Sequence, residues 1–213
     1  MTESKIGNVK SILTDEQRNS LTAIVNVGVE KAAIVLQEMI GSNISLQIPF
    51  IKVVSLQNIE SETKYQGDTG PLSAVRLDFR GPFEGTAALV FPPESAEKIV
   101  SALIGDEPGS PAPPDSEVVS TLTEVGNIVM NGVMGSIGNA LDKRIDYAVP
   151  SFTKYTVKNI VSTTTVSKPN TRLLMAQTRF TVEELKIDGD IMLYFEIQSF
   201  DELVALLSNN TTV

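Results

Sequence analysis

The stretch LTAIVNVGVEKAAIVLQEMIGSNISLQIPF, residues 21–50, recurs in modified form about a hundred residues later as LTEVGNIVMNGVMGSIGNALDKRIDYAVPSF, residues 122–152. Each copy places an asparagine, Asn26 or Asn127, within an apolar run. Asparagine is unfavourable inside a helix because its side chain competes for backbone hydrogen bonds. Its presence at the equivalent place in both copies therefore requires an explanation.

Aligning the two asparagines shows what the copies share and where they differ. The alignment superimposes Pro49 on Pro150 and places Glu124 opposite Ala23. The second copy therefore carries a carboxylate together with the amide, whereas the first copy carries the amide alone.

Each half is predicted to begin with a long helix. In the first half, Thr14 and Gln17 have the spacing of a capping box, and Gly41 is a typical helix stop. Apolar residues recur between these limits at the spacing of a buried helical face. The corresponding helix of the second half is predicted over 115–141.

Strands and a short helix are predicted to follow each long helix. In the first half, 44–56 reads as a strand, 59–71 as a polar loop, 74–92 as a hairpin and 94–105 as a short helix. In the second half, strands are expected over 147–153, 155–166, 173–182 and 187–198, and a short helix follows.

The repeated order predicts one α+β domain with pseudo-twofold symmetry, an extended β-sheet, two long helices and two short helices. The repeats cover about 12–105 and 116–210, and the Pro-rich segment 106–115 joins them. Joining both halves into one sheet buries more apolar surface than folding them apart. Two independent domains remain the alternative, in which each half closes its own sheet edges.

Composition excludes several classes of function. The net charge of −9 and the pI of about 4.6 disfavour nucleic acid and anionic membrane surfaces as partners. The chain has no cysteine or histidine, which excludes disulfides, thiol nucleophiles and imidazole bases. The N-terminus lacks a signal-like apolar core and no stretch resembles a membrane span, so we expect a cytoplasmic protein.

A polar stripe distinguishes the second long helix. At about 100° per residue, four polar residues share one face, opposite an apolar set. The stripe consists of Ser120, Glu124, Asn127 and Asn131. The matching residues of the first helix are Asn19, Ala23, Asn26 and Glu30. The stripe is either a solvated face inherited by duplication or a rigid carboxylate and amide pair that acts on a docked partner.

The spacing of these residues resembles the active-site signature of the CheC, CheX and FliY group of chemotaxis phosphatases, with CheC the most similar. Three residues separate Ser120 from Glu124, two separate Glu124 from Asn127, and twenty-two separate Asn127 from Pro150. EVGNI resembles the core of the motif, and NVGVEKAA is similar to the family's first helix without its glutamate. The FRGPFEGTAALVF strand pair also fits the family, so the resemblance covers nearly the whole chain.

The resemblance implies a phosphatase that acts on the aspartyl phosphate of a CheY-type response regulator. Asn127 would orient the hydrolytic water, and Glu124 would pair with the regulator's active-site lysine. Ser120 and Pro150, which belong to the signature, would support them, and Asn131 is a further supporting residue that the stripe itself predicts. The regulator supplies magnesium, so the resemblance implies no cofactor or metal ion held by this chain.

The first half departs from the signature, with Asn19 in place of serine or aspartate and Ala23 in place of glutamate. A methyl group cannot pair with lysine, so Asn26 is predicted to form a weak or inactive second site unless Glu30 substitutes for the missing carboxylate. Gly28 and Gly126 are expected to allow close packing or the close approach of a partner rather than chemistry.

Two other functions remain open. The first is a non-catalytic adaptor that binds a signalling or flagellar-switch partner, and a CheD-type receptor deamidase is a further partner that the resemblance suggests. The second is a small-molecule sensor whose polar stripe lines a pocket between the halves. The sensor function requires a buried stripe, and exposure of the Asn127 side chain would argue against it.

Overall fold

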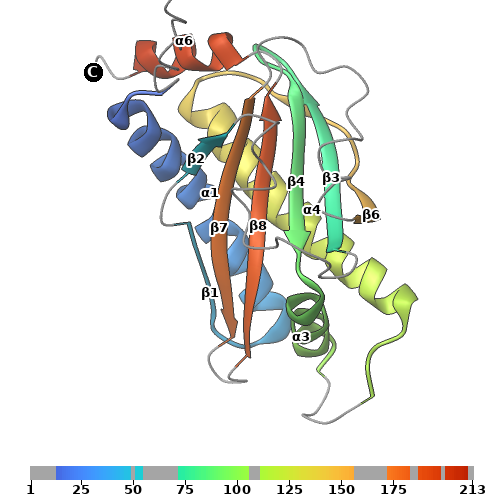
Figure 1. Ribbon diagram of the computed structural model, residues 1–213. Coiled ribbons are helices and arrows are strands. Elements are labelled where there is room, and N and C mark those ends of the chain that lie inside the picture. The colour runs from blue at the N-terminus through green and yellow to red at the C-terminus, as the bar shows by residue number, and fades with distance from the viewer. Residues whose placement is uncertain are drawn as a thin grey trace, which may run out of the picture.

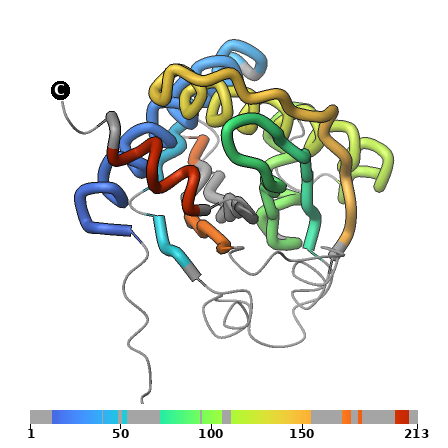
Figure 2. The backbone as a smooth tube through the Cα atoms, turned by 90° about the horizontal axis from the view of Figure 1, so that it is seen from above, coloured from blue at the N-terminus to red at the C-terminus, as the bar shows by residue number. Residues whose placement is uncertain are grey.

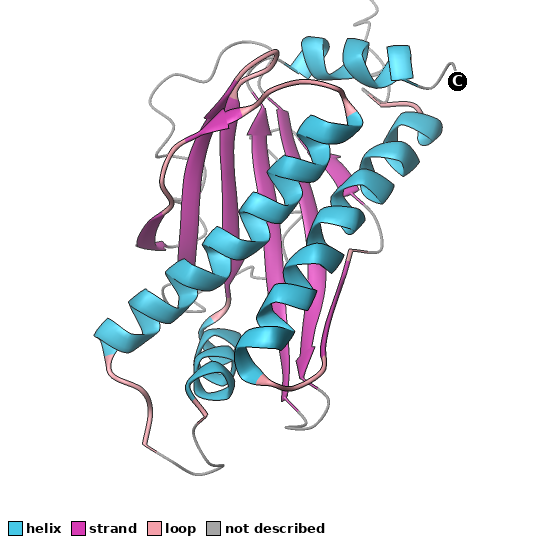
Figure 3. Cartoon of the chain, turned by 180° about the vertical axis from the view of Figure 1, so that it is seen from behind, coloured by secondary structure: helices cyan, strands magenta, loops and turns pink. Residues whose placement is uncertain are grey.

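Two long helices lie side by side across one face of an eight-stranded antiparallel sheet (Figure 3). The computed structural model describes residues 13–48, 51–54, 72–105, 111–155, 172–182, 187–197 and 200–210. Seen from above, the helices form one layer and the sheet forms the other (Figure 2). The predicted mixture of helices and an extended sheet is confirmed.

The first long helix, α1, spans Asp15–Ile40, as its capping signals predict. The Thr14 hydroxyl accepts from the Gln17 N–H, and the Gln17 side chain accepts from the Thr14 N–H, so the capping box is complete. Gly41 ends the helix with a φ of 65°, in the left-handed region that favours glycine.

The other helices also begin and end close to their predicted bounds. The second long helix, α4, spans Asp115–Ala140, and the short helices are α3, Pro93–Ile104, and α6, Phe200–Asn210. The two short helices lie at opposite ends of the sheet (Figure 1).

The strands follow the order predicted within each half. In the first half they are β1, Ile44–Gln47; β2, Ile51–Val54; β3, Leu72–Arg80; and β4, Gly85–Phe91. In the second half they are β5, Asp146–Tyr147; β6, Ser151–Tyr155; β7, Arg172–Val182; and β8, Ile187–Ile197. The order of elements in the second half thus repeats the order in the first.

The two halves exchange strands. The sheet order is β1-β7-β8-β4-β3-β5, with β2 also paired to β7 and β6 to β3. Strands β1 and β2 of the first half therefore extend the hairpin of the second half, and β5 and β6 extend the hairpin of the first. This exchange supports the expected single domain of two repeats, which stays a prediction.

Each half contains one extra residue at the equivalent point of its sheet edge. The chain advances four residues from Gln47 to Ile51, while β7 advances three, from Arg179 to Ala176. In the other half, Tyr147 pairs with Phe79 and Ser151 with Arg76, the same four-to-three mismatch. Both sheet edges therefore have the same pairing pattern, with four residues facing three on the partner strand.

This mismatch corrects the predicted strand boundaries. Continuous strands over 44–56 and 147–153 were expected, but β1 ends at Gln47 and β5 ends at Tyr147, and β2 and β6 begin four residues later. Pro150, between β5 and β6, provides no N–H for the ladder. Tyr155, expected to begin a new strand, is the last residue of β6. The predicted loop 59–71 and the rest of the predicted strand 155–166 lie outside the described residues.

Helices α1 and α4 touch through their backbones at two glycines. A Cβ on Gly28 would lie 2.6 Å from the Gly132 carbonyl oxygen, and a Cβ on Gly132 would lie 2.5 Å from the Gly28 carbonyl oxygen. The Ser136 hydroxyl also donates to the Ile24 carbonyl oxygen across the interface at 2.8 Å. The expected packing role of Gly28 is therefore confirmed.

Helix α1 is also long and apolar enough, over Asp15–Met39, to cross a membrane. Its buried face instead packs against α4 and the sheet, with Leu21, Val25, Val29 and Leu36 almost fully buried in the core. The core helix of a two-layer fold satisfies the same length and composition criteria as a membrane span.

Candidate functional site

The polar stripe of α4 lies on a segment of the helix that is pressed onto the sheet. Gly126 is buried, and a Cβ at this position would lie 2.5 Å from Cγ1 of Val75 on β3. Only a residue without a side chain permits this approach. The expected packing role of Gly126 is confirmed, and the glycine fixes the height of Asn127, the next residue, above the sheet.

The four residues of the stripe lie at or near the surface. Ser120 and Glu124 are exposed, whereas Asn127 and Asn131 are half-buried. Glu124 and Asn127 are three residues apart on a continuous α-helix, so their side chains leave the same face about one turn apart. A docked partner can therefore contact the carboxylate and the amide at the same time.

Two hydrogen bonds engage other members of the stripe. Asn131 donates from Nδ2 to Oδ1 of Asn127 at 3.0 Å, and the Ser120 hydroxyl donates to the Glu117 carbonyl oxygen at 3.1 Å. Within the described part of the chain, the Glu124 carboxylate has neither a side-chain hydrogen bond nor an ion pair. The carboxylate is thus available to an external cation.

The equivalent asparagine of the first half has a different environment. Asn26 donates from Nδ2 to the Ile48 carbonyl oxygen at 2.6 Å and accepts at Oδ1 from the Ile48 N–H at 2.8 Å. Both ends of its amide are therefore occupied by one backbone residue. Nothing in the sequence singled out Ile48, although it directly precedes the proline of the repeated pattern.

The second half has no such link between the helix and the sheet edge. The residue equivalent to Ile48 is Val149, whose side chain is 89% exposed, and Pro150 is half-buried. The preceding residue, Ala148, donates its N–H to the Asp78 carbonyl oxygen at 2.9 Å. Among the described contacts, none joins Asn127 to Val149. The two asparagines therefore share a sequence position but not a bonding pattern.

The remaining residues of the first-half stripe do not form a second pair of a carboxylate and a free amide. Asn19, Ala23 and Glu30 are all exposed on α1. Glu30 lies one turn beyond Asn26, but the amide that it would have to assist is bound to Ile48.

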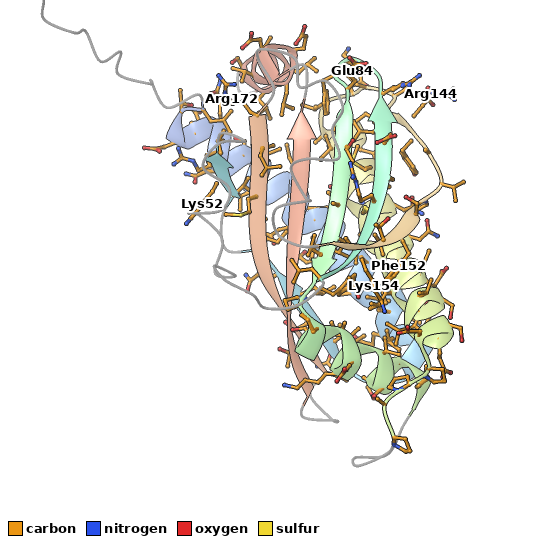
Figure 4. All side chains as sticks on the ribbon, turned by 45° about the vertical axis from the view of Figure 1, so that its right-hand side comes forward. Lys52, Glu84, Arg144, Phe152, Lys154 and Arg172 are labelled. Atoms are coloured by element: carbon orange, nitrogen blue, oxygen red, sulfur yellow. The ribbon has the colours of Figure 1, made fainter. Side chains whose placement is uncertain are left out.

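A salt bridge connects the beginning of α4 to the sheet edge. Lys154 on β6 pairs through Nζ with Oδ1 of Asp115 at 3.0 Å. Phe152 lies beside Lys154 next to α4 (Figure 4), and it pairs in register with Val75, the residue beneath Gly126. Strand β6 therefore contacts the beginning of α4 and lies next to the part of β3 on which Gly126 packs.

The structure places the stripe outside any described ligand cavity. An apolar cavity of about 10 Å³ lies between the helices and the sheet, far smaller than a typical small-molecule site. Its lining residues are Leu21, Val25, Ile51, Phe83, Met134, Ile137, Leu174 and Leu203. None of these lining residues belongs to the stripe, so this cavity does not support the sensor function, and Asn127 itself is half-buried. Among the residues that the structure describes, no group of three acidic side chains could hold a metal ion.

Comparison with known proteins agrees with this geometry. Residues 73–168, which include β3, β4, α4 and β6, match the family model described as chemotaxis phosphatase CheX. The chain is similar in structure to FliY of Thermotoga maritima, with a TM-score of 0.75 and 17% identity over 93% of this chain and 98% of that one.

Two further solved structures share the fold. One is FliM in its complex with SpeE from H. pylori, with a TM-score of 0.70 and 11% identity, covering 94% of this chain and 99% of that one. The other is CheX from Desulfovibrio desulfuricans, with a TM-score of 0.51 and 14% identity, covering 82% and 99%. The predicted family resemblance is confirmed, and the greater similarity to CheC stays a prediction.

Proposed function

We propose that this chain accelerates hydrolysis of the aspartyl phosphate on a CheY-type response regulator, because residues 73–168 match the model of the chemotaxis phosphatase CheX and the fold resembles those of FliY and CheX. The single observation that carries this proposal is the pair on α4: an exposed carboxylate without an internal partner among the described residues, Glu124, one turn before a half-buried amide, Asn127. The proposal assigns the chemistry to the second half of the chain.

Each side chain has a role that suits its chemistry. Asn127 cannot abstract a proton at neutral pH, but its amide donates and accepts hydrogen bonds at once, so it can hold a water in line with the phosphorus atom. Glu124 carries a negative charge that pairs with the active-site lysine of the regulator and fixes the docked orientation. The helix carries both groups on a rigid backbone.

The energetic requirement is modest. Phosphoryl transfer depends mainly on positioning and on stabilisation of charge, and the regulator brings its own magnesium, lysine and aspartate. An acceleration of about 100-fold over the regulator's own hydrolysis requires only about 2.7 kcal/mol of barrier reduction. One positioned amide and one ion pair can supply this amount. In this proposal the magnesium ion remains a ligand of the regulator.

The first half is proposed to be inactive. Ala23 provides no carboxylate, and the amide of Asn26 is bound at both ends to Ile48. Binding a water would require breaking two hydrogen bonds to half-buried backbone groups, which is costly when no partner replaces them. The proposed enzyme therefore has one working site.

The cellular setting follows from the proposed substrate. A phosphorylated response regulator is cytoplasmic, so we expect this protein to act there. The family resemblance also suggests a CheD-type receptor deamidase as a second partner. Co-purification of the two proteins, followed by a phosphatase assay with and without the deamidase, tests that interaction separately from the reaction.

The test of the proposed function is the rate of dephosphorylation of a CheY-like regulator from the same genome. Wild type should accelerate the reaction, and N127A and E124Q should each abolish most of the acceleration. N26A should retain it, and so should E30Q, the matched control that removes an equally exposed carboxylate from the first helix. If wild type binds the regulator without accelerating hydrolysis, the chain is an adaptor that retains the motif without the reaction.

A further inference from the structure

We propose that Asn131 is a positioning residue that fixes the orientation of the Asn127 amide for the hydrolytic water. This inference rests on the proposed function. Asn131 donates from Nδ2 to Oδ1 of Asn127 at 3.0 Å, and both side chains are half-buried on the same face of α4. Asn131 lies outside the signature formed by Ser120, Glu124, Asn127 and Pro150.

An asparagine that orients a water needs a defined amide orientation. The two ends of the amide have nearly the same shape, but one end donates hydrogen bonds and the other accepts them. A rotation of about 180° about χ2 exchanges the two ends at little steric cost. The hydrogen bond from Asn131 selects one of the two orientations, with Oδ1 of Asn127 towards Asn131 and Nδ2 left available to a partner.

The backbone around this pair is held on both sides by close contacts. Gly126 presses α4 onto Val75 of β3, and Gly132 presses the same helix onto Gly28 of α1. Asn127 directly follows the first contact, and Asn131 directly precedes the second. The helix itself sets the spacing of the two asparagines, and the two glycine contacts hold this part of the helix against β3 and α1, as a preorganised site requires.

The first half orients its asparagine through different contacts, and it has no residue equivalent to Asn131 that could form the asparagine pair. The residue equivalent to Asn131 is Glu30, whose ionised carboxylate has no proton to donate to Asn26. The Ile48 backbone orients the amide of Asn26 instead, and it occupies both the Nδ2 donor and the Oδ1 acceptor. Among the described residues, the half that carries Glu124 orients its asparagine through Oδ1 and leaves Nδ2 without a hydrogen bond, whereas the other half engages both ends.

The inference predicts a specific series of variants. N131A removes the donor and should lower kcat roughly fivefold, about 1 kcal/mol, which is the size of one neutral hydrogen bond. N131D replaces the donor with an acceptor of nearly the same shape, so it should reverse the Asn127 amide and lower kcat by more than about tenfold. The KM for the phosphorylated regulator should stay within about twofold in N131A, because Asn131 acts through Asn127.

A loss of stability should not account for the lower kcat of N131A. Alanine has a higher helix propensity than asparagine, so N131A should keep or raise the unfolding temperature. N139A, at an exposed position on the same helix, serves as the matched control and should leave kcat unchanged. In the N127A background, N131A should have no further effect on the rate, because the group that it orients is absent.

A second readout does not depend on catalysis. The side-chain ¹⁵N–¹H₂ resonances of Asn127, assigned by their loss in N127A, should move in N131A and N131D and stay in place in N139A. An active wild type whose kcat and Asn127 resonances are unchanged in N131A and N131D would overturn this inference alone. A wild type that accelerates no hydrolysis would overturn the proposed function, and with it the catalytic part of this inference, even if the resonances move.

Discussion

The side chain of Asn26 on α1 is joined to the backbone of Ile48 by two hydrogen bonds, of 2.6 and 2.8 Å. The amide thereby acts like a neighbouring strand residue and connects the helix to the sheet edge where β1 ends. At the equivalent place in the other half, Asn127 accepts a hydrogen bond from Asn131 instead. The same residue type at the repeated position therefore differs between the halves. Asn26 connects its helix to the sheet, whereas no hydrogen bond from Nδ2 of Asn127 is found among the described residues.

Replacing Asn26 with alanine should therefore affect stability and not activity. Two half-buried backbone groups of Ile48 would lose their partner, and we expect a loss of about 1–3 kcal/mol in the free energy of unfolding. Urea denaturation monitored by circular dichroism measures this loss. N19A, an exposed asparagine on the same helix, should change the free energy by less than about 0.5 kcal/mol. Equal effects of the two variants would contradict the role assigned to Asn26.

Restoring the missing carboxylate should not restore a second active site. A23E recreates the Glu and Asn spacing in the first helix, but the amide of Asn26 remains bound to Ile48. We expect A23E to leave the phosphatase rate unchanged in the wild-type background and to rescue no activity in N127A. Recovery of hydrolysis in the A23E/N127A protein would show that the Ile48 contacts open readily when a regulator docks.

Alanine substitutions at the helix crossing should separate close packing from helix propensity. G28A and G132A would each place a Cβ about 2.5 Å from backbone atoms of the other helix, so both should destabilise the fold by more than about 2 kcal/mol. Gly135 also lies in α4, but a Cβ at this position would meet no described atom within 4 Å, and G135A should stabilise the fold by about 0.5–1 kcal/mol. Thermal unfolding of the three variants gives the comparison.

The packing of Gly126 links the core to the candidate site. In G126A, the new Cβ would meet the side chain of Val75 at 2.5 Å and push α4 away from β3 beneath Asn127. We expect both the unfolding temperature and kcat to fall. The double variant G126A/V75A makes room for the methyl group and should recover part of the lost rate. A G126A protein with wild-type kcat would show that the site tolerates a shift of the helix.

Local signals explain why the helices could be predicted from the sequence. The capping box of Thr14 and Gln17 and the left-handed glycines Gly41 and Gly105 act within a few residues, and α1 and α3 end where these glycines place them. The face that carries Glu124 and Asn127 also follows from helical periodicity alone. On this face Glu124 is exposed and Asn127 is half-buried, and the catalytic roles of both stay predictions.

The strand boundaries depend on residues that are distant in the sequence. The splits between β1 and β2 and between β5 and β6 arise where four residues face three on the partner strand. The partner strand in each case belongs to the other half of the chain, so no local pattern reveals the register.

The sequence by itself determined the two long helices, the repeated order of elements and the presence of a carboxylate and an amide one turn apart. These features depend on side-chain periodicity and on caps that act over a few residues. Only the tertiary structure decided that the halves exchange strands, and that Ile48 binds both ends of the Asn26 amide while no described contact joins Asn127 to the equivalent Val149. A hydrogen bond depends on atoms brought within about 3 Å by packing, and two identical asparagines therefore acquire different partners once each helix meets its own sheet edge.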